Sequence, residues 1–226
     1  MSLDELVPCI PALRADEAEL QLEARAFAES RLAPGAGKWE AGGAIPADVI
    51  SELCALGLGG ATLPRDVGGA GMTHVGALAV FEELARGDMA VGFALLCQNS
   101  CARSIWLHGT PAQRDEWLPS LLSGAELGAY AITEPGAGSD PAGMASTATE
   151  RDGGFVLDGH KTWISNAPVA GLFVTSVKTD PDLGARGVST FVVARGTAGL
   201  EVGARLSTLG ARALTVGEVH FDGCRV

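Results

Sequence analysis

A glycine-rich segment with hydroxyl groups at both ends has the clearest potential for chemistry in this sequence. Residues 130–140 read Tyr-Ala-Ile-Thr-Glu-Pro-Gly-Ala-Gly-Ser-Asp. Gly136 and Gly138 allow the backbone to approach a ligand closely and to present N–H donors in a concave nest, while Thr133 and Ser139 add hydroxyl groups. Such an array suits an anionic or carbonyl-rich ligand, but a purely structural turn explains the pattern equally well.

The segment differs from the two common glycine-rich fingerprints for phosphate binding. A GxGxxG dinucleotide site needs a third glycine and a following helical pattern, and the sequence has neither at this point. A Walker loop ends in Gly-Lys-Ser or Gly-Lys-Thr, which is also missing here. The pattern therefore indicates neither of these nucleotide sites.

A second cluster, residues 160–166, reads His-Lys-Thr-Trp-Ile-Ser-Asn. Side chains alternate along a strand, so Lys161, Trp163 and Ser165 are expected to share one face. An indole beside a hydroxyl group suits a flat heteroaromatic ligand, because it offers stacking area and a hydrogen bond. The competing interpretation, which applies to most lone tryptophans, is a core residue at the end of a strand.

Three acidic residues near these segments, Glu134, Asp140 and Asp158, are candidates for a general base. Glu134 and Asp140 are more simply explained as residues that organise the turn through bonds to nearby backbone N–H groups, and Asp158-Gly159 has the pattern of a turn. The histidines do not have the spacing of metal ligands, so we interpret them as structural or surface residues and expect no metal site: His74, His108, His160 and His220.

The composition describes a folded, acidic protein. The 226 residues carry 16 Lys and Arg against 27 Asp and Glu, a net charge of −11, and 47% of them are hydrophobic. This length allows one large domain or two small ones, and the acidic balance argues against nucleic-acid binding. No apolar run predicts a membrane span, and the scattered cysteines are expected to be reduced thiols of a cytoplasmic protein: Cys9, Cys54, Cys97, Cys101 and Cys224.

The first part of the chain has helical patterns. A capping box at Asp16 and Glu19 predicts a helix that ends at Pro34-Gly35. Pro46 suits the first turn of a second helix, which Gly57 stops. Thr73, Asp88 and Thr110 are expected to cap three more helices, over about 73–86, 88–108 and 110–124.

The second part has the patterns of strands. Short β-favouring runs occur at 155–157, 172–174, 190–193 and 219–221, and a strand is expected to lead into the segment at Tyr130. Three turn dipeptides are expected to separate strands: Asp152-Gly153, Asp158-Gly159 and Asp222-Gly223. Helices followed by strands predict an α+β fold, with an all-α domain at 1–125 and an antiparallel β domain at 126–226.

Taken together, these segments resemble the acyl-CoA dehydrogenase family. Residues 131–143 are similar to the family's run of a small residue, an aliphatic residue, Thr-Glu, a glycine-rich turn and Ser-Asp, and residues 158–167 are similar to its dGxKxWIsNa pattern. Further similar segments follow the family's order along the chain, at 63–71, 82–88, 209–212 and 218–222.

The resemblance implies a flavoprotein oxidoreductase of lipid metabolism. Such enzymes bind FAD between a helical N-terminal domain, a barrel-like β middle domain and a C-terminal four-helix bundle, and they desaturate acyl thioesters. Ser139 would lie at the thioester arm of the substrate, Trp163 over one side of the flavin, and Ser165, where many members have Thr, near flavin N5. The implied cofactor-binding residues are Tyr130, Ala131, Ile132, Thr133, Gly136, Gly138, Ser139, Trp163, Ile164 and Ser165.

The resemblance also implies that the catalytic base is a glutamate of the C-terminal domain, which follows the matched residues in the family. We therefore expect no catalytic base in this chain and little activity from it alone. Three explanations stay open: one subunit of a split enzyme, a shortened form of a longer enzyme, or a non-catalytic flavin-binding subunit.

The resemblance implies several partners as well. They are an acyl-CoA or acyl-carrier-protein substrate, a domain or subunit that supplies the four-helix bundle, further copies in an oligomer, and an electron-accepting flavoprotein. A flavin-dependent monooxygenase or oxidase on the same scaffold is the alternative enzyme function.

Overall fold

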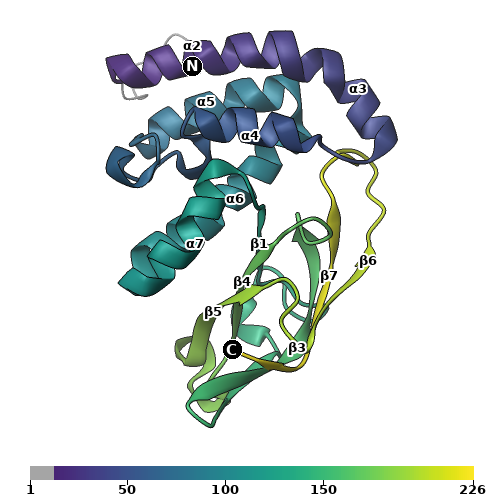
Figure 1. Ribbon diagram of the computed structural model, residues 1–226. Helices are drawn as coiled ribbons and strands as arrows, with labels where there is room; N and C mark the ends of the chain where they lie inside the picture. Colours follow the sequence, from purple (N-terminus) through teal and green to yellow (C-terminus); the bar gives the residue numbers. More distant parts are fainter. Residues whose placement is uncertain (1–12) are drawn as a thin grey trace, which may run out of the picture.

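The computed structural model describes residues 13–226, with helices followed by strands. Figure 1 shows the helices gathered over one end of a curved sheet, and the segment between the last two strands reaching back to the helices. No helix in the described part of the chain has both the length and the apolar character needed to cross a bilayer. Cys9 lies outside the described residues, and the other cysteines are unpaired thiols, as expected: Cys54, Cys97, Cys101 and Cys224.

The predicted caps of the later helices are confirmed. Thr73 Oγ1 accepts from Gly76 N at 3.0 Å, and Asp88 Oδ1 accepts from Ala90 N at 2.8 Å. Thr110 forms a capping box at the start of its helix. The helices are α2 (Ala15–Phe27), α3 (Ala33–Gly42), α4 (Ala47–Ala55), α5 (His74–Gly87), α6 (Met89–His108) and α7 (Pro111–Ser123), and short 3-10 segments lie at Leu58–Gly60, Arg65–Val67, Pro141–Gly143 and Pro181–Gly187.

The start of α2 and the role of Pro34 differ from the expectation. Arg14 rather than Asp16 precedes the first helical residue, and Glu17 rather than Glu19 completes the capping box. Pro34 does not end the helix, because the chain continues through a π-helical turn at Ala28–Leu32 into α3. Pro34 lies at the start of α3, directly after the π-helical turn.

The strands form one sheet in the order β1-β4-β2-β3-β7-β6, with β5 paired to β4. The expectation of a purely antiparallel sheet is corrected, because β1 runs parallel to β4. Gly171 N donates to Leu127 O at 2.9 Å, so both strands begin at the same end of the sheet. The strands are β1 (Gly128–Ala131), β2 (Thr147–Arg151), β3 (Gly154–Ser165), β4 (Leu172–Lys178), β5 (Val188–Ala194), β6 (Leu200–Arg205) and β7 (Val216–Arg225).

Only one of the three Asp-Gly dipeptides separates strands. Asp152-Gly153 forms the turn between β2 and β3, as predicted. Asp158-Gly159 lies inside β3 and Asp222-Gly223 inside β7, so the other two predictions are wrong. The register between β3 and β7 shifts next to Gly159, and a Cβ built there would lie 2.0 Å from Ser146 Oγ. Gly159 therefore permits a bulge and a close approach within the sheet.

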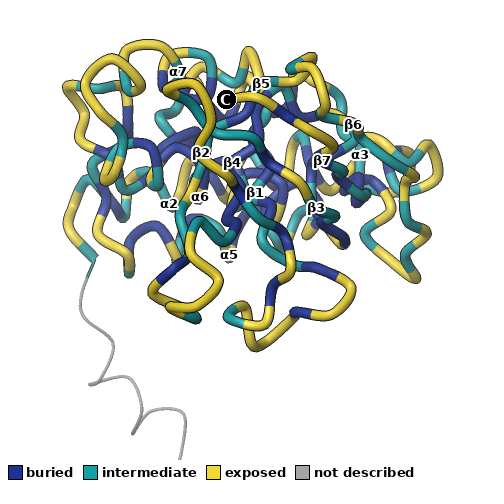
Figure 2. Tube along the Cα trace, turned by 90° about the horizontal axis from the view of Figure 1, so that it is seen from below, coloured by how far each residue is buried: buried dark blue, intermediate teal, exposed yellow. Residues whose placement is uncertain are grey.

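Buried side chains connect the helical and β regions. Ala213, Leu214 and Val216, from the segment that leads into β7, belong to the core of the helices. Leu172 and Val174 of β4 share a second core with α6 and α7. Figure 2 shows these buried stretches in the middle of the molecule, with exposed loops around them.

Glu17 links the start of α2 to the start of α5. Its buried carboxylate accepts from Arg14 N at 3.0 Å and from Thr73 N at 2.6 Å, and it lies 3.1 Å from Arg14 Nη2. Burial by itself raises the pKa of Glu17, but these donors outweigh burial and hold its pKa at about 2. The folded protein therefore favours the ionised carboxylate.

We expect Glu17 to make the free energy of unfolding depend on pH in the acidic range. Its contribution is fully present above the unfolded pKa of about 4.3 and is lost as the pH falls towards about 2. Glu17→Gln should lower the urea midpoint at neutral pH, and the difference from the parent protein should shrink in acid. Urea titrations at the two pH values measure this, with Glu19→Gln on the exposed face of α2 as the control. An equal loss at both pH values would contradict the assignment.

Candidate functional site

The glycine-rich segment forms a tight loop after β1. Glu134 N donates to Ala137 O at 3.0 Å, and Ala137 N donates back to Glu134 O at 3.1 Å, so Pro135 and Gly136 form the tip. Gly136 and Gly138 do not have positive φ, and a Cβ built on either meets nothing within 4 Å. The fold itself does not require glycine at these positions, and the loop backbone is open to a molecule outside it.

A buried ion pair anchors this loop to β3. The ammonium group of Lys161 is fully buried and donates to Glu134 Oε1 at 2.7 Å. It also donates to the carbonyl oxygens of Ile132 at 3.2 Å and Ser176 at 2.7 Å. The Lys161 ammonium group therefore connects three segments: the end of β1 through Ile132, the loop through Glu134, and β4 through Ser176.

The surroundings of Glu134 keep its carboxylate ionised. Burial by itself raises the pKa of Glu134, but the Lys161 ammonium and two backbone donors hold it below its usual range. Those donors are Ala145 N at 2.5 Å and Ser146 N at 3.1 Å. Burial lowers the pKa of Lys161, and the carboxylate opposes this. Glu134 thus organises the loop, as the sequence indicates, and its proton-accepting oxygens are already engaged.

The other two acidic candidates also have structural contacts. Asp140 Oδ1 accepts from Ala142 N at 3.1 Å and caps the short 3-10 segment that follows the loop. Asp158 Oδ1 accepts from Gly223 N at 2.8 Å and so joins β3 to β7. The prediction that Asp140 organises the turn is confirmed, while Asp158 stabilises a bulge instead of a turn.

Trp163 is held in an unusual conformation beside the loop. The register between β3 and β7 breaks between Lys161 and Ile164, and Trp163 takes a φ of 58° with 58% of its surface exposed. The expectation that Lys161 and Trp163 share a face is therefore wrong, because the bulge interrupts the alternation. A bulky residue at positive φ stores about 1–3 kcal/mol of strain, and such strain is concentrated at functional sites.

The backbone beside Trp163 is bonded to the segment that leads into the glycine-rich loop. Thr162 N donates to Thr133 O at 2.9 Å, so the residue before Trp163 is bonded directly to the loop. Ser165 is half-buried and lies next to Cys97 of α6. Burial raises the pKa of the Cys97 thiol to about 11, and the neighbouring Ser165 side chain opposes this.

The remaining predicted residues fall into three groups. Ala131 and Ile164 have buried side chains in the core of the sheet, which leaves only their backbone for a ligand. Tyr130, Ile132 and Thr133 are half-buried. Three residues of the loop are exposed: Gly136, Gly138 and Ser139.

Comparison with known families identifies both regions of the chain. Residues 14–125 match the acyl-CoA dehydrogenase N-terminal domain, and residues 129–224 match the acyl-CoA dehydrogenase middle domain. The chain belongs to the acyl-CoA dehydrogenase family. The helical region followed by a sheet is the arrangement that the resemblance implies.

Individual relatives match three quarters or more of this chain, but the match covers only about half of their own length. Mitochondrial isobutyryl-CoA dehydrogenase of Dictyostelium discoideum is 34% identical over 95% of this chain and 51% of that protein. L-prolyl-[peptidyl-carrier protein] dehydrogenase of Pseudomonas fluorescens is 42% identical over 75% of this chain and 46% of that protein. The structure of a glutaryl-CoA dehydrogenase from Mycobacterium smegmatis in complex with FADH2 has a TM-score of 0.88 at 30% identity, over 100% of this chain and 55% of that one. The chain thus spans about half the length of the curated relatives it matches.

Two buried side-chain amides hold the start of β1, and the sequence predicts no role for either of them. Gln98 of α6 accepts from Gly128 N at 2.5 Å and donates to the carbonyl oxygens of Leu121 at 2.6 Å and Glu126 at 2.9 Å. Asn166 Nδ2 donates to Gly128 O at 3.1 Å and to Ala94 O. Asn166 belongs to the family pattern, but Gln98 lies in an ordinary helical run, so its role becomes visible only in the fold. We call Gln98 and Asn166 together the clamp on β1, because both side chains bond to the backbone of Gly128.

Four large apolar side chains of α6 are exposed. Met89, Phe93, Leu96 and Leu107 recur at helical spacing, and each is between 43% and 53% exposed. Side chains of this kind are normally covered by another element or a partner. The stripe lies on the helix whose Cys97 contacts Ser165.

Proposed function

We propose that this chain binds FAD along residues 130–139 and against Trp163, as part of an acyl-thioester dehydrogenase. The observation that carries the proposal is the conformation of Trp163, an exposed indole at positive φ. The backbone of Thr162, the residue before Trp163, is bonded to the loop at Thr133 O. The open backbone at Gly136 and Gly138 fits the close approach of a large planar cofactor.

Each residue of the site has a role in this proposal. FAD, when bound, supplies the acceptor for a hydride from the β carbon of the acyl chain. Trp163 covers one side of the ring system, and the Thr133 hydroxyl and the loop N–H groups donate to its pyrimidine edge. Donors at that edge stabilise negative charge as it develops there. Ser165 lies near N5, and Ser139 lies at the thioester arm of the substrate.

Removal of the α proton requires a base from outside the described site. Glu134 is paired with Lys161, and Asp140 and Asp158 hold backbone N–H groups. A proton at carbon is removed efficiently only by a positioned base. We therefore assign the base to a further domain or partner subunit, and the apolar stripe on α6 supports contact with such an element.

The substrate class is an acyl thioester of CoA or of a carrier protein. The names of the two curated relatives support both carriers, since one acts on an acyl-CoA and the other on a carrier-bound prolyl group. We assign reoxidation of the bound flavin to an electron-accepting flavoprotein.

The proposal predicts that Trp163→Ala weakens FAD binding about tenfold, since stacking of a base on an aromatic ring contributes about 1–3 kcal/mol. Titration of the flavin-free protein with FAD, followed by flavin fluorescence, measures the change. Trp163→Phe keeps an aromatic face and should retain most of the affinity. Equal FAD affinity of Trp163→Ala and the parent protein would remove the main support for this site.

A further inference from the structure

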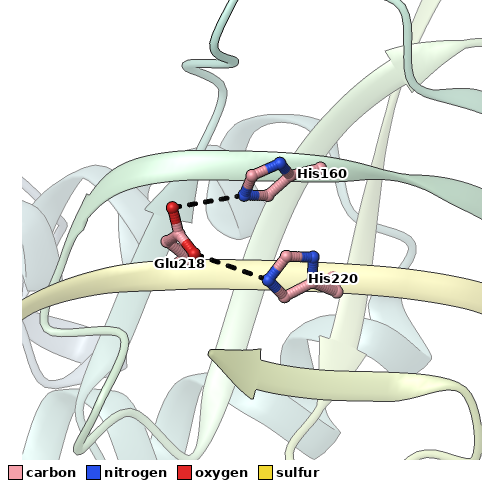
Figure 3. A group of neighbouring side chains, drawn as sticks. All are labelled: His160, Glu218 and His220. Carbon is pink, nitrogen blue, oxygen red and sulfur yellow. Dashed lines mark ion pairs between the residues drawn. The ribbon is translucent and has the colours of Figure 1, made fainter. Parts of the chain in front are cut away.

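Two histidines on neighbouring strands face the same carboxylate. His160 of β3 lies directly opposite His220 of β7, and their rings stack with centroids 4.2 Å apart. Glu218 precedes His220 by two residues and so projects from the same side of β7. Figure 3 shows the Glu218 carboxylate beside the stacked imidazoles, with one oxygen directed at each ring. The 60-residue separation of the histidines hides this pairing in the sequence.

The three side chains present ligand atoms towards one another. His160 Nε2 lies 3.5 Å from Glu218 Oε1, and His220 Nε2 lies 3.7 Å from Glu218 Oε2. One ligand atom from each residue lies within 4.8 Å of the others. His160 Nε2 is also shielded from solvent and has no hydrogen-bond partner. A buried polar atom without a partner is costly, and a metal ion is one way to satisfy it.

We propose that His160, Glu218 and His220 form a binding site for a divalent transition-metal cation of the zinc class. Two imidazole nitrogens and one carboxylate are a known ligand set for Zn²⁺, which keeps its fourth position for water in such sites. Imidazole ligands favour Zn²⁺, Co²⁺, Ni²⁺ or Cu²⁺ over Mg²⁺ or Ca²⁺. A bound ion would fasten β3 to β7 across the sheet.

Small side-chain movements bring the ligands to bonding geometry. Tetrahedral Zn²⁺ with bonds of about 2.0–2.1 Å separates its ligand atoms by about 3.3 Å, which is a few tenths of an ångström less than the two separations between histidine nitrogen and Glu218 oxygen. The two rings are nearly parallel, at 17°, so each must turn about its Cβ–Cγ bond to aim Nε2 at one point. This torsion is soft in histidine, and both side chains are partly exposed.

Gly203 of β6 leaves room for His220. A Cβ built on Gly203 would lie 2.8 Å from His220 Nε2 and 3.2 Å from Glu218 Cβ. Gly203 does not have a positive φ, so alanine fits its backbone conformation. Gly203→Ala therefore displaces a ligand without removing one, which makes it a specific test of the site.

The proposed metal site is independent of the FAD site. Lys161 and Val219, the neighbours of His160 and His220, are fully buried on the other face of the sheet. Lys161 belongs to the ion pair that holds the glycine-rich loop. Loss of metal binding would therefore leave the proposed flavin function untouched.

Titration with Co²⁺ tests the metal site directly. EDTA-treated protein should bind one Co²⁺ per chain with visible d–d absorption, and calorimetry should show Zn²⁺ competing for the same site. His220→Gln and Glu218→Gln should each weaken binding at least about tenfold, because even partners outside the coordination sphere change metal affinity by that factor. Gly203→Ala should weaken binding as well.

His74→Gln, an exposed histidine at the start of α5, is the matched control and should bind Co²⁺ like the parent. Failure of the parent protein to bind Co²⁺ or Zn²⁺ would overturn the proposal, as would an equal loss in His74→Gln. A thermal shift in Glu218→Gln without any metal uptake by the parent would identify a simple ion pair and also overturn it.

Discussion

Replacing Lys161 with Met is expected to lower the free energy of unfolding by about 3–5 kcal/mol, the range found when one partner of a buried ion pair is removed. The variant leaves the Glu134 carboxylate buried without its counter-charge. The carbonyl oxygens of Ile132 and Ser176 lose their donor at the same time. Met has a similar length and shape, so the loss reports charge and hydrogen bonding more than an empty cavity.

Chemical denaturation of the purified variants measures this effect. Lys178→Met, on β4 and only half-buried, is the matched control and should change stability little. Adding Glu134→Gln to Lys161→Met should recover part of the loss, because a neutral amide needs no counter-charge and still accepts from Ala145 N or Ser146 N. A loss below about 1 kcal/mol for Lys161→Met, as for an exposed pair, would show that the buried pair does not hold the loop.

Local signals predict most helices of this chain because the causes of those helix ends are local. Thr73, Asp88 and Thr110 each cap a helix with a side chain that reaches two or three residues along the chain. Pro34 is the exception, since the same residue suits the end of one helix or the first turn of the next. The continuation through the π-helical turn depends on packing that the local pattern does not contain.

The Asp-Gly dipeptides show where local reasoning stops. Asp152-Gly153 and Asp158-Gly159 have the same residue types, but the first is a turn and the second is a bulge inside β3. The difference comes from β7, whose Gly223 N binds the Asp158 carboxylate. A partner 65 residues away thus decides the role of Asp158, and no short-range pattern includes that partner.

The same limit applies to the candidate site. The sequence pointed to the glycine-rich loop and Trp163 through residue type and family pattern, and the structure places the two segments side by side. The sequence did not reveal that the Lys161 side chain is buried while the Trp163 side chain is exposed. The bulge that separates the two residues depends on the pairing of β3 with β7.

Gln98→Leu is expected to lower the free energy of unfolding by about 3–5 kcal/mol, since each buried backbone group left without a partner costs about 1–3 kcal/mol. Gly128 N and Glu126 O lose this partner, while Leu121 O keeps its bond from Gly124 N. Leucine is similar in size, so unpaired polar groups dominate the loss. Thermal and urea unfolding measure it, with Gln21→Leu on the half-buried side of α2 as the control.

The expected effects of Gln98→Leu and Trp163→Ala separate the clamp from the ligand site. Gln98 is fully buried and fixes Gly128 at the start of β1, so its loss should lower stability first and FAD affinity only through a loosened loop. Trp163 is exposed and strained, so its loss should lower FAD affinity and leave unfolding nearly unchanged. If Gln98→Leu unfolds like the parent protein, Gly128 must be held by Asn166 alone, and the two amides would not act as one clamp.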